Sequence, residues 1–122
     1  STHTGQFYKG TLRSGQVLES ESSIIILGDV NPGARVISTG NVVVLGSLKG
    51  LVFAGANGNQ DSFVVALEMA PMQIRIGDVI ARSGDAAPLK PGRNVDPKIA
   101  FVDDNNIYIE KLDKNVLSDI RL

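Results

Sequence analysis

SSIIILGDV (residues 22–30) and GNVVVLGSL (residues 40–48) are two copies of one pattern, shifted by eighteen positions so that Leu27 aligns with Leu45. A shorter period runs through both copies, because an aliphatic residue recurs every six positions without a break. The series consists of Leu12, Leu18, Ile24, Val30, Val36, Val42, Leu48 and Ala54. A fixed period of this kind indicates a repeat architecture.

A small or aliphatic residue lies two positions after each member of the series, as Ser14 follows Leu12 and Val44 follows Val42. Residues two apart in a strand lie on the same face, so each pair is predicted to point inward. Three sides, each one short period long, make one coil whose length equals the longer period. We therefore expect an all-β fold, a short triangular parallel β-helix of about three to four coils.

The six-residue period fails at Gln60, and the rest of the chain is expected to close the β-helix with a C-terminal capping segment. In order, the later segments are a turn-rich loop (55–62), two strand-like segments (63–69 and 74–81), an irregular segment (82–97) and two capping strands (99–102 and 106–112). The register after residue 56 is not defined by the pattern. The chain divides into residues 1–10, an N-terminal tail or the remnant of an interdomain linker, residues 11–112, the β-helix domain, and residues 113–122, a C-terminal tail.

Composition argues against several classes of function. The 122-residue chain has a net charge of −1, which gives no support for a nucleic-acid groove or a polybasic membrane patch. It has no cysteine and a single histidine, His3, so neither a thiolate metal site nor a histidine-based catalytic triad is expected. The longest apolar run, residues 63–67, is far shorter than the roughly 20 residues of a membrane helix. We expect a chain that is not an enzyme, needs no metal or cofactor and does not insert into a membrane.

One side of the predicted triangle is apolar on its outer face as well. The outward apolar residues are Ile25, Leu27, Val43 and Leu45, with Val65 and Leu67 as a third rung. A strand that is apolar on both faces is expected to be buried on both. Either a homodimer packs face to face through these residues, or residues 99–112 fold over them.

A small basic face is predicted beside the turn Arg13-Ser14-Gly15-Gln16. Asn31 and Lys49 follow Arg13 at successive intervals of the longer period. Neighbouring coils should therefore place Arg13 and Lys49 on one face about 10 Å apart. From its chemistry alone, this turn is either an ordinary solvated turn or a recognition site.

Small residues accompany this basic face. Gly15 and Gly33 are also one longer period apart and are expected to stack, which leaves the backbone accessible to a partner, and Gly50 follows Lys49. Ser14 is expected to face the core with Leu12.

Two other classes of protein share a six-residue period. Hexad-repeat acyltransferases usually need a catalytic histidine on the coil, and this sequence has none there. Self-assembling β-helix scaffolds of the bactofilin type need only coils that polymerise, and they remain an alternative.

Three motifs in this order closely resemble the C-terminal domain of the MinC septum-site-determining proteins of bacteria: RSGQ (13–16), GDVNPGARVISTGNVVVLGSLKGLVFAGANGN (28–59) and IRIGDVIARS (74–83). The resemblance spans residues 11–112. It implies a right-handed β-helix that dimerises through one face. It also implies that Arg13, Ser14, Gly15 and Gln16 contribute to binding the membrane-associated ATPase MinD. Stacking on this motif adds Asn31, Gly33, Lys49 and Gly50 as further candidates.

The resemblance further implies a cell-division inhibitor, a cytoplasmic protein that ATP-bound MinD recruits peripherally to the inner face of the cell membrane. There the two proteins antagonise the polymer of FtsZ and block septum formation at wrong sites. FtsZ is contacted directly by this domain or through a separate N-terminal domain. That N-terminal domain is missing from this sequence, so the chain is expected to be a fragment.

Overall fold

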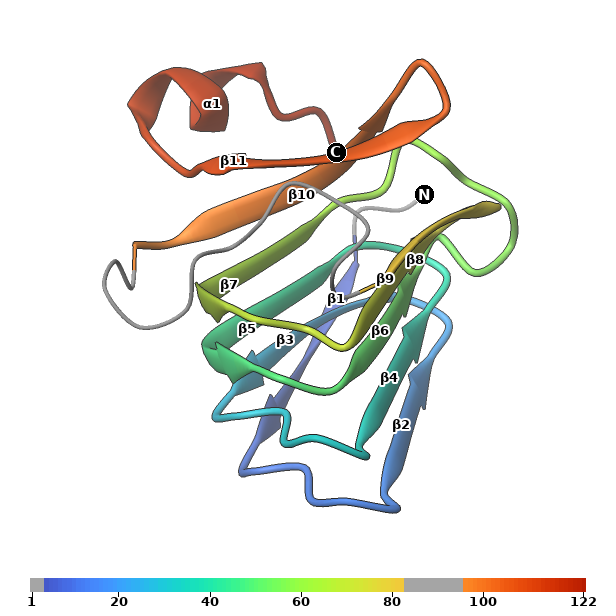
Figure 1. Ribbon diagram of the computed structural model, residues 1–122, viewed down its shortest axis with the longest axis vertical. Coiled ribbons are helices and arrows are strands. Elements are labelled where there is room, and N and C mark those ends of the chain that lie inside the picture. The colour runs from blue at the N-terminus through green and yellow to red at the C-terminus, as the bar shows by residue number, and fades with distance from the viewer. Residues whose placement is uncertain (1–3, 83–95) are drawn as a thin grey trace.

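The computed structural model describes residues 4–82 and 96–122, which form a β-solenoid with two sheets (Figure 1). The six-stranded sheet has the order β1-β3-β5-β7-β10-β11 and the five-stranded sheet the order β2-β4-β6-β8-β9. The first consists of β1 (Gly5–Lys9), β3 (Ser23–Leu27), β5 (Val42–Leu48), β7 (Val64–Met69), β10 (Lys98–Asp103) and β11 (Asn106–Lys111). The second consists of β2 (Val17–Ser20), β4 (Arg35–Ser38), β6 (Leu51–Ala54), β8 (Gln73–Ile76) and β9 (Val79–Arg82). Helix α1 (Lys114–Asp119) follows the last strand.

Strands of successive coils pair in parallel with the predicted spacing. Gln6 pairs with Ile24 and Ile24 with Val42 in the six-stranded sheet, and each pairing advances by one longer period. Val17 pairs with Arg35 in the five-stranded sheet at the same step. The prediction of stacked parallel coils is confirmed.

The third side of the triangle is much narrower than the two sheets. Single parallel bridges join Leu12 to Val30 and Val30 to Leu48. Between the third and fourth coils the step grows beyond the longer period, because Val42 pairs with Val64. The predicted loop at residues 55–62 accommodates the additional residues.

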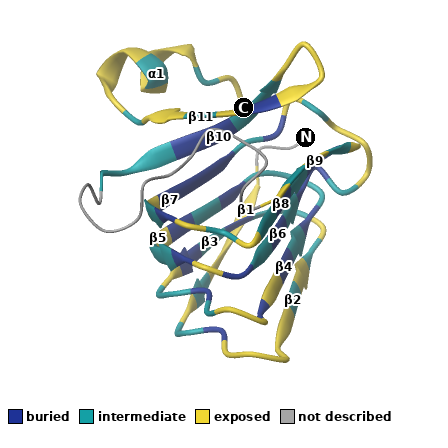
Figure 2. Ribbon diagram, in the orientation of Figure 1, coloured by how far each residue is buried: buried dark blue, intermediate teal, exposed yellow. Residues whose placement is uncertain are grey.

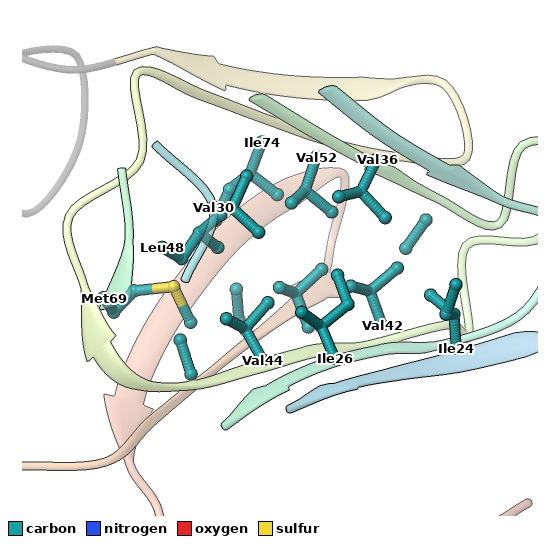
Figure 3. Close-up of a cluster of buried hydrophobic side chains, with 14 of the residues drawn as sticks. Ile24, Ile26, Val30, Val36, Val42, Val44, Leu48, Val52, Met69 and Ile74 are labelled. Carbon is teal, nitrogen blue, oxygen red and sulfur yellow. The ribbon is translucent and has the colours of Figure 1, made fainter. Parts of the chain in front are cut away.

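Aliphatic side chains from all three sides fill the solenoid (Figure 3). Val42 comes from the six-stranded sheet, Val36 from the five-stranded sheet and Val30 from the third side, and all three are fully buried. Burial of one such side chain stabilises the fold by about 1.5–3 kcal/mol. Inward residues on successive sides are six positions apart, which explains the six-residue period. In-register coils stack each of them on its counterpart eighteen positions away.

The prediction that Ser14 faces the core is wrong. Ser14 is exposed, and so is Pro32 at the equivalent place in the next coil. The chain turns directly after Leu12 and directly after Val30, so each of these coils has one inward residue on the third side instead of two. In the second coil Ala34, which is fully buried, is the next inward residue.

The prediction of a tail over residues 1–10 is wrong for Gly5–Lys9, which form β1. This strand pairs with β3 along its whole length, for example Phe7 with Ile25 and Tyr8 with Ile26. The repeat therefore begins one strand earlier than the aliphatic series. Residues 1–3 lie outside the described part of the chain.

The C-terminal end of the solenoid is closed by antiparallel strands. The two predicted capping strands are β10 and β11, whereas residues 74–81, expected as one strand-like segment, belong to two strands, β8 and β9. β9 pairs antiparallel with β8, β10 with β7, and β11 with β10. Asp104 and Asn105 join β10 to β11 with φ values of 50° and 64°, as a type I′ hairpin turn requires. Most of the segment expected to be irregular, residues 83–95, lies outside the described residues. The expected C-terminal tail contains α1, whose N-terminus is capped by the side chain of Asp113.

Candidate partner-binding surfaces

The turn at residues 13–16, called the RSGQ turn below, is closed by hydrogen bonds of its own. The backbone N–H of Gln16 donates to the carbonyl oxygen of Arg13 over 2.9 Å. The backbone N–H of Arg13 donates to Oε1 of Gln16 over 2.6 Å. Gly15 has a φ of 88°, in the left-handed region that favours glycine. All four residues are exposed, so the turn has a defined shape and faces solvent.

An equivalent turn in the second coil supports the RSGQ turn. There the N–H of Ala34 donates to the carbonyl oxygen of Asn31 over 3.0 Å, and Gly33 has a φ of 88°. The two turns are linked, because the N–H of Gly15 donates to the carbonyl oxygen of Gly33 over 3.0 Å. Ser14 lies against Gly33, where a Cβ would overlap the hydroxyl of Ser14. The predicted stacking of Gly15 and Gly33 is confirmed.

The predicted column of Arg13, Asn31 and Lys49 is present as a geometric arrangement. The N–H of Asn31 donates to the carbonyl oxygen of Leu12 over 2.9 Å, and that of Lys49 to the carbonyl oxygen of Val30 over 2.8 Å. Arg13 and Lys49 are exposed and Asn31 is half-buried. Neither Arg13 nor Lys49 forms a salt bridge with a described residue. This corner of the solenoid therefore presents two cations to solvent.

Gly50, a candidate for contact with a partner, is buried. A Cβ at this position would lie 2.5 Å from the carbonyl oxygen of Ala34 and 2.6 Å from that of Asn31. Gly50 therefore allows the third coil to approach the second, and it is not part of the exposed surface. Gly33 is exposed, but its Cα is partly covered by Ser14.

The chemistry of this corner suits binding. The Arg13 guanidinium can hold a carboxylate through two parallel hydrogen bonds, which the ammonium of a lysine cannot reproduce.

Within residues 4–82 and 96–122, no group of three or more His, Cys, Asp or Glu side chains could hold a metal ion. No helix in this part of the chain is long and apolar enough to cross a membrane.

The outer face of the six-stranded sheet carries an apolar surface, called the outer ribbon below. Register places Phe7, Ile25, Val43 and Val65 in one row across the strands. Two residues further along their strands, Leu27, Leu45 and Leu67 are 39%, 41% and 42% exposed. The predicted ribbon is thus present, with one difference: Val65 is buried, at 6% exposed.

Phe7 belongs to the outer ribbon and was missed in the sequence. It is 72% exposed and lies beside Ile25 in the neighbouring strand. The signal was available, because Phe7 precedes Ile25 by one longer period. Gln6 and Tyr8 interrupt the aliphatic series at this point, so residues 5–9 resembled a tail.

The alternative that residues 99–112 fold over the ribbon is wrong. These residues contribute to β10 and β11, which extend the six-stranded sheet at the edge of β7 instead of covering its face (Figure 1). Phe101 of β10 and Tyr108 of β11 stack with ring centroids 6.0 Å apart. The exposed leucines of the ribbon therefore remain open.

Comparison with known proteins agrees with the resemblance in the motifs. The family model described as "Septum formation inhibitor MinC, C-terminal domain" matches residues 6–112. A probable septum site-determining protein MinC from Lachnospira eligens is 58% identical over 125 residues, which cover 98% of this chain and 51% of the relative. Another from Acetivibrio thermocellus is 46% identical over 106 residues, covering 87% and 46%. The chain thus spans about half the length of these curated relatives.

A solved structure has the same fold. A chain of the MinC:MinD cell division protein complex from Aquifex aeolicus superposes with a TM-score of 0.80 at 36% sequence identity. The match covers 89% of this chain and 87% of that chain.

Proposed function

Because the chain belongs to the family of septum formation inhibitor MinC C-terminal domains, we propose that it is a non-enzymatic adaptor in the selection of the division site. In this proposal it homodimerises through the outer ribbon and binds a MinD-type ATPase in its ATP-bound state through the RSGQ turn. The ATPase then recruits it from the cytoplasm to the inner face of the cell membrane. There it acts against FtsZ assembly, directly or through an N-terminal domain of the kind that the longer family members carry.

The observation that carries the proposal is the RSGQ turn itself. Four exposed residues that match the family's motif are held in one shape by two internal hydrogen bonds and by a second turn beneath them. A surface that is ordered before binding loses less entropy when a partner docks. The likeness to a chain solved in a MinC:MinD complex supports the same partner for this chain.

Each residue of the turn has a different role in this proposal. Arg13 binds a carboxylate of the ATPase through its guanidinium. Gly15 has no other atom near the place of a Cβ, so the partner's backbone can approach it closely. Gln16 accepts the Arg13 N–H with its oxygen, so its amide nitrogen remains as a donor for the partner. Lys49 and Asn31 extend the contact along the corner.

Dimerisation is expected to raise the apparent affinity of the chain for the ATPase. A face-to-face dimer carries two RSGQ turns and can hold two ATPase molecules at once. When the ATPase is bound to a membrane, the second contact forms at a high effective concentration. The dimer then binds the membrane-bound ATPase with a higher apparent affinity than a single RSGQ turn would.

A self-assembling scaffold is supported less well by the ends of the solenoid. At the end formed by β1 and β2, called the open end below, Gln6 occupies the position that Ile24 and Val42 fill in later coils. Its side chain accepts a hydrogen bond from Ser20 over 3.0 Å. The opposite end, called the capped end, is closed by antiparallel strands. At the open end the column of the six-stranded sheet thus ends in a polar residue, and at the capped end antiparallel strands replace the parallel coils.

Co-sedimentation with phospholipid vesicles tests the proposed function. The chain is mixed with vesicles and with the MinD-type ATPase from the same organism, in the presence of either ATP or ADP. We expect the chain to sediment only when both the ATPase and ATP are present. Sedimentation of the chain alone would favour the scaffold, and no sedimentation under any condition would overturn the adaptor function.

A further inference from the structure

The third side of the solenoid carries two columns of surface residues. Its inward residues, Leu12, Val30 and Leu48, lie on segments that join the two sheets and stack on one another (Figures 1 and 2). The residue after each of them belongs to the column of Arg13, Asn31 and Lys49, called the basic column below. The residues before the second and third of them, together with the residue that pairs with Ser47 in the fourth coil, are Asp29, Ser47 and Glu68, called the acidic column.

Hydrogen bonds to Ser47 hold the acidic column in place. The backbone N–H of Ser47 donates to Oδ1 of Asp29 over 2.8 Å, and its hydroxyl donates to Oε1 of Glu68. Gly46 leaves room for the Asp29 carboxylate, because a Cβ at residue 46 would lie 2.5 Å from Oδ1. Only one oxygen of each carboxylate is used in this way, and Asp29, Ser47 and Glu68 are all half-buried. The two carboxylates are therefore ordered and still accessible from outside.

The opposite charges of the two columns do not pair with each other. Neither Asp29 nor Glu68 forms a salt bridge with a residue in the described part of the chain, and the same holds for Arg13 and Lys49. Two positions along an extended segment separate the columns by about 7 Å. At physiological ionic strength, exposed charges that far apart are largely screened from each other. The columns therefore contribute little to the stability of the coil, and both remain available to a partner.

The acidic column borders the surface proposed to bind the ATPase. Arg13 belongs both to the RSGQ turn and to the basic column, and Asp29 is separated from Asn31 of that column only by the inward residue Val30. A specific protein interface buries about 800 Å² on each partner, which corresponds to roughly 20–30 residues. The four residues of the turn are far fewer. A partner that covers Arg13 and Lys49 therefore also covers the acidic column beside them.

We propose that Asp29 and Glu68 determine the orientation and the specificity of docking by binding lysine or arginine side chains of the ATPase. This inference rests on the binding of the ATPase in the proposed function. The matching surface of the ATPase then has carboxylates opposite Arg13 and Lys49, and cations about 7 Å to one side of them. A half turn of the partner about the axis normal to this face would bring like charges together, which is unfavourable. An ATPase that lacks the cations is rejected, because it leaves two carboxylates covered and unpaired.

A double variant, Asp29→Asn with Glu68→Gln, tests this role. It removes both charges and keeps an amide oxygen to accept each hydrogen bond from Ser47. Binding to the ATP-bound ATPase is followed by surface plasmon resonance at about 0.05 M and about 0.5 M salt. At low salt we expect the affinity to fall at least about fivefold, mainly through slower association, and at high salt we expect the difference to disappear. The melting temperature should not change.

The matched control is Asp119→Asn with Glu110→Gln, which removes the same charges at exposed residues of the capped end and should bind within about twofold of the wild type. Unchanged or tighter binding of Asp29→Asn with Glu68→Gln at low salt would overturn the proposal, and so would an equal loss in the control. A loss that persists at high salt would also overturn it, because it would show a structural role of the two side chains. In each of these cases, weaker binding of Arg13→Glu would leave the RSGQ turn as the binding site. Wild-type affinity in Arg13→Glu would instead contradict the proposed function itself.

Discussion

Ser14 of the RSGQ turn lies against Gly33 of the next coil, so closely that a Cβ at residue 33 would overlap the Ser14 hydroxyl. Gly33 also has a φ of 88°, which residues with a side chain rarely adopt. The shape of the exposed turn thus depends on a glycine that belongs to another coil.

Gly33→Ala is therefore expected to weaken binding to the ATPase although residue 33 needs no direct contact with it. Displacing Ser14 shifts the RSGQ turn, and we expect an affinity loss of about tenfold and a stability loss of about 1–3 kcal/mol. Titration calorimetry and urea unfolding measure the two effects. Gly58→Ala is the matched control, because Gly58 has a φ of 99° but no atom within 4 Å of the place of a Cβ. Equal affinity losses in both variants would contradict the supporting role of Gly33.

Gln16→Leu removes the acceptor for the Arg13 N–H and keeps the approximate size of the side chain. We expect the RSGQ turn to become mobile, seen as faster amide hydrogen exchange at Arg13, together with weaker binding to the ATPase. The loss of one exposed hydrogen bond costs only about 0.5–1.5 kcal/mol of stability. Unchanged exchange at Arg13 would show that the side chain of Gln16 does not hold the turn.

Leu45→Arg is expected to separate the dimer without unfolding the coil. Leu45 is 41% exposed at the centre of the ribbon, and a charge there would be buried in a face-to-face interface without a partner. Analytical ultracentrifugation should show a monomer with an unchanged circular dichroism spectrum. Val17→Arg, at a residue that is 45% exposed on the five-stranded sheet, should remain dimeric. A dimeric Leu45→Arg variant would place the interface elsewhere.

Ser38→Ala tests the polar corner between the two sheets. Ser38 is fully buried, donates to the carbonyl oxygen of Ser22 over 2.7 Å and accepts from the N–H of Gly40 over 2.9 Å. Its loss leaves two partly buried backbone groups without this partner, at a cost of about 1–3 kcal/mol in the free energy of unfolding. Urea denaturation measures this cost. Ser118→Ala, which removes one exposed hydrogen bond, should change stability far less.

The core was predictable because parallel coils stack equivalent residues directly on one another. Val30, Val36 and Val42, all fully buried, lie on three successive sides and give the six-residue interval, and Val42 stacks on Ile24 at the eighteen-residue interval. The outward ribbon followed from the same interval. The corner at Ser14 did not follow, because a tight turn changes the direction of the chain and the alternation of a strand ends there.

The two ends of the chain were less predictable than the middle. End coils have solvent on one side, so they tolerate polar residues such as Gln6 where inner coils need aliphatic ones. Strand β1 was missed for that reason. Helix α1 was missed because its six residues include only two apolar ones, which is too few to show a helical period. The hairpin of β10 and β11 was visible because Asp103, Asp104 and Asn105 form a clear turn signal between two apolar segments.

The affinity of Arg13→Glu for the ATP-bound MinD-type ATPase tests the central claim most directly. Lys114→Glu, an equal change of charge at an exposed residue of α1, is the control. A carboxylate that loses its arginine and meets a like charge costs about 2–5 kcal/mol, so Arg13→Glu should bind at least about 30-fold more weakly and Lys114→Glu within about twofold of the wild type. An Arg13→Glu chain that is folded and dimeric, and that binds the ATPase as tightly as the wild type, would contradict the assignment of the RSGQ turn as the binding site.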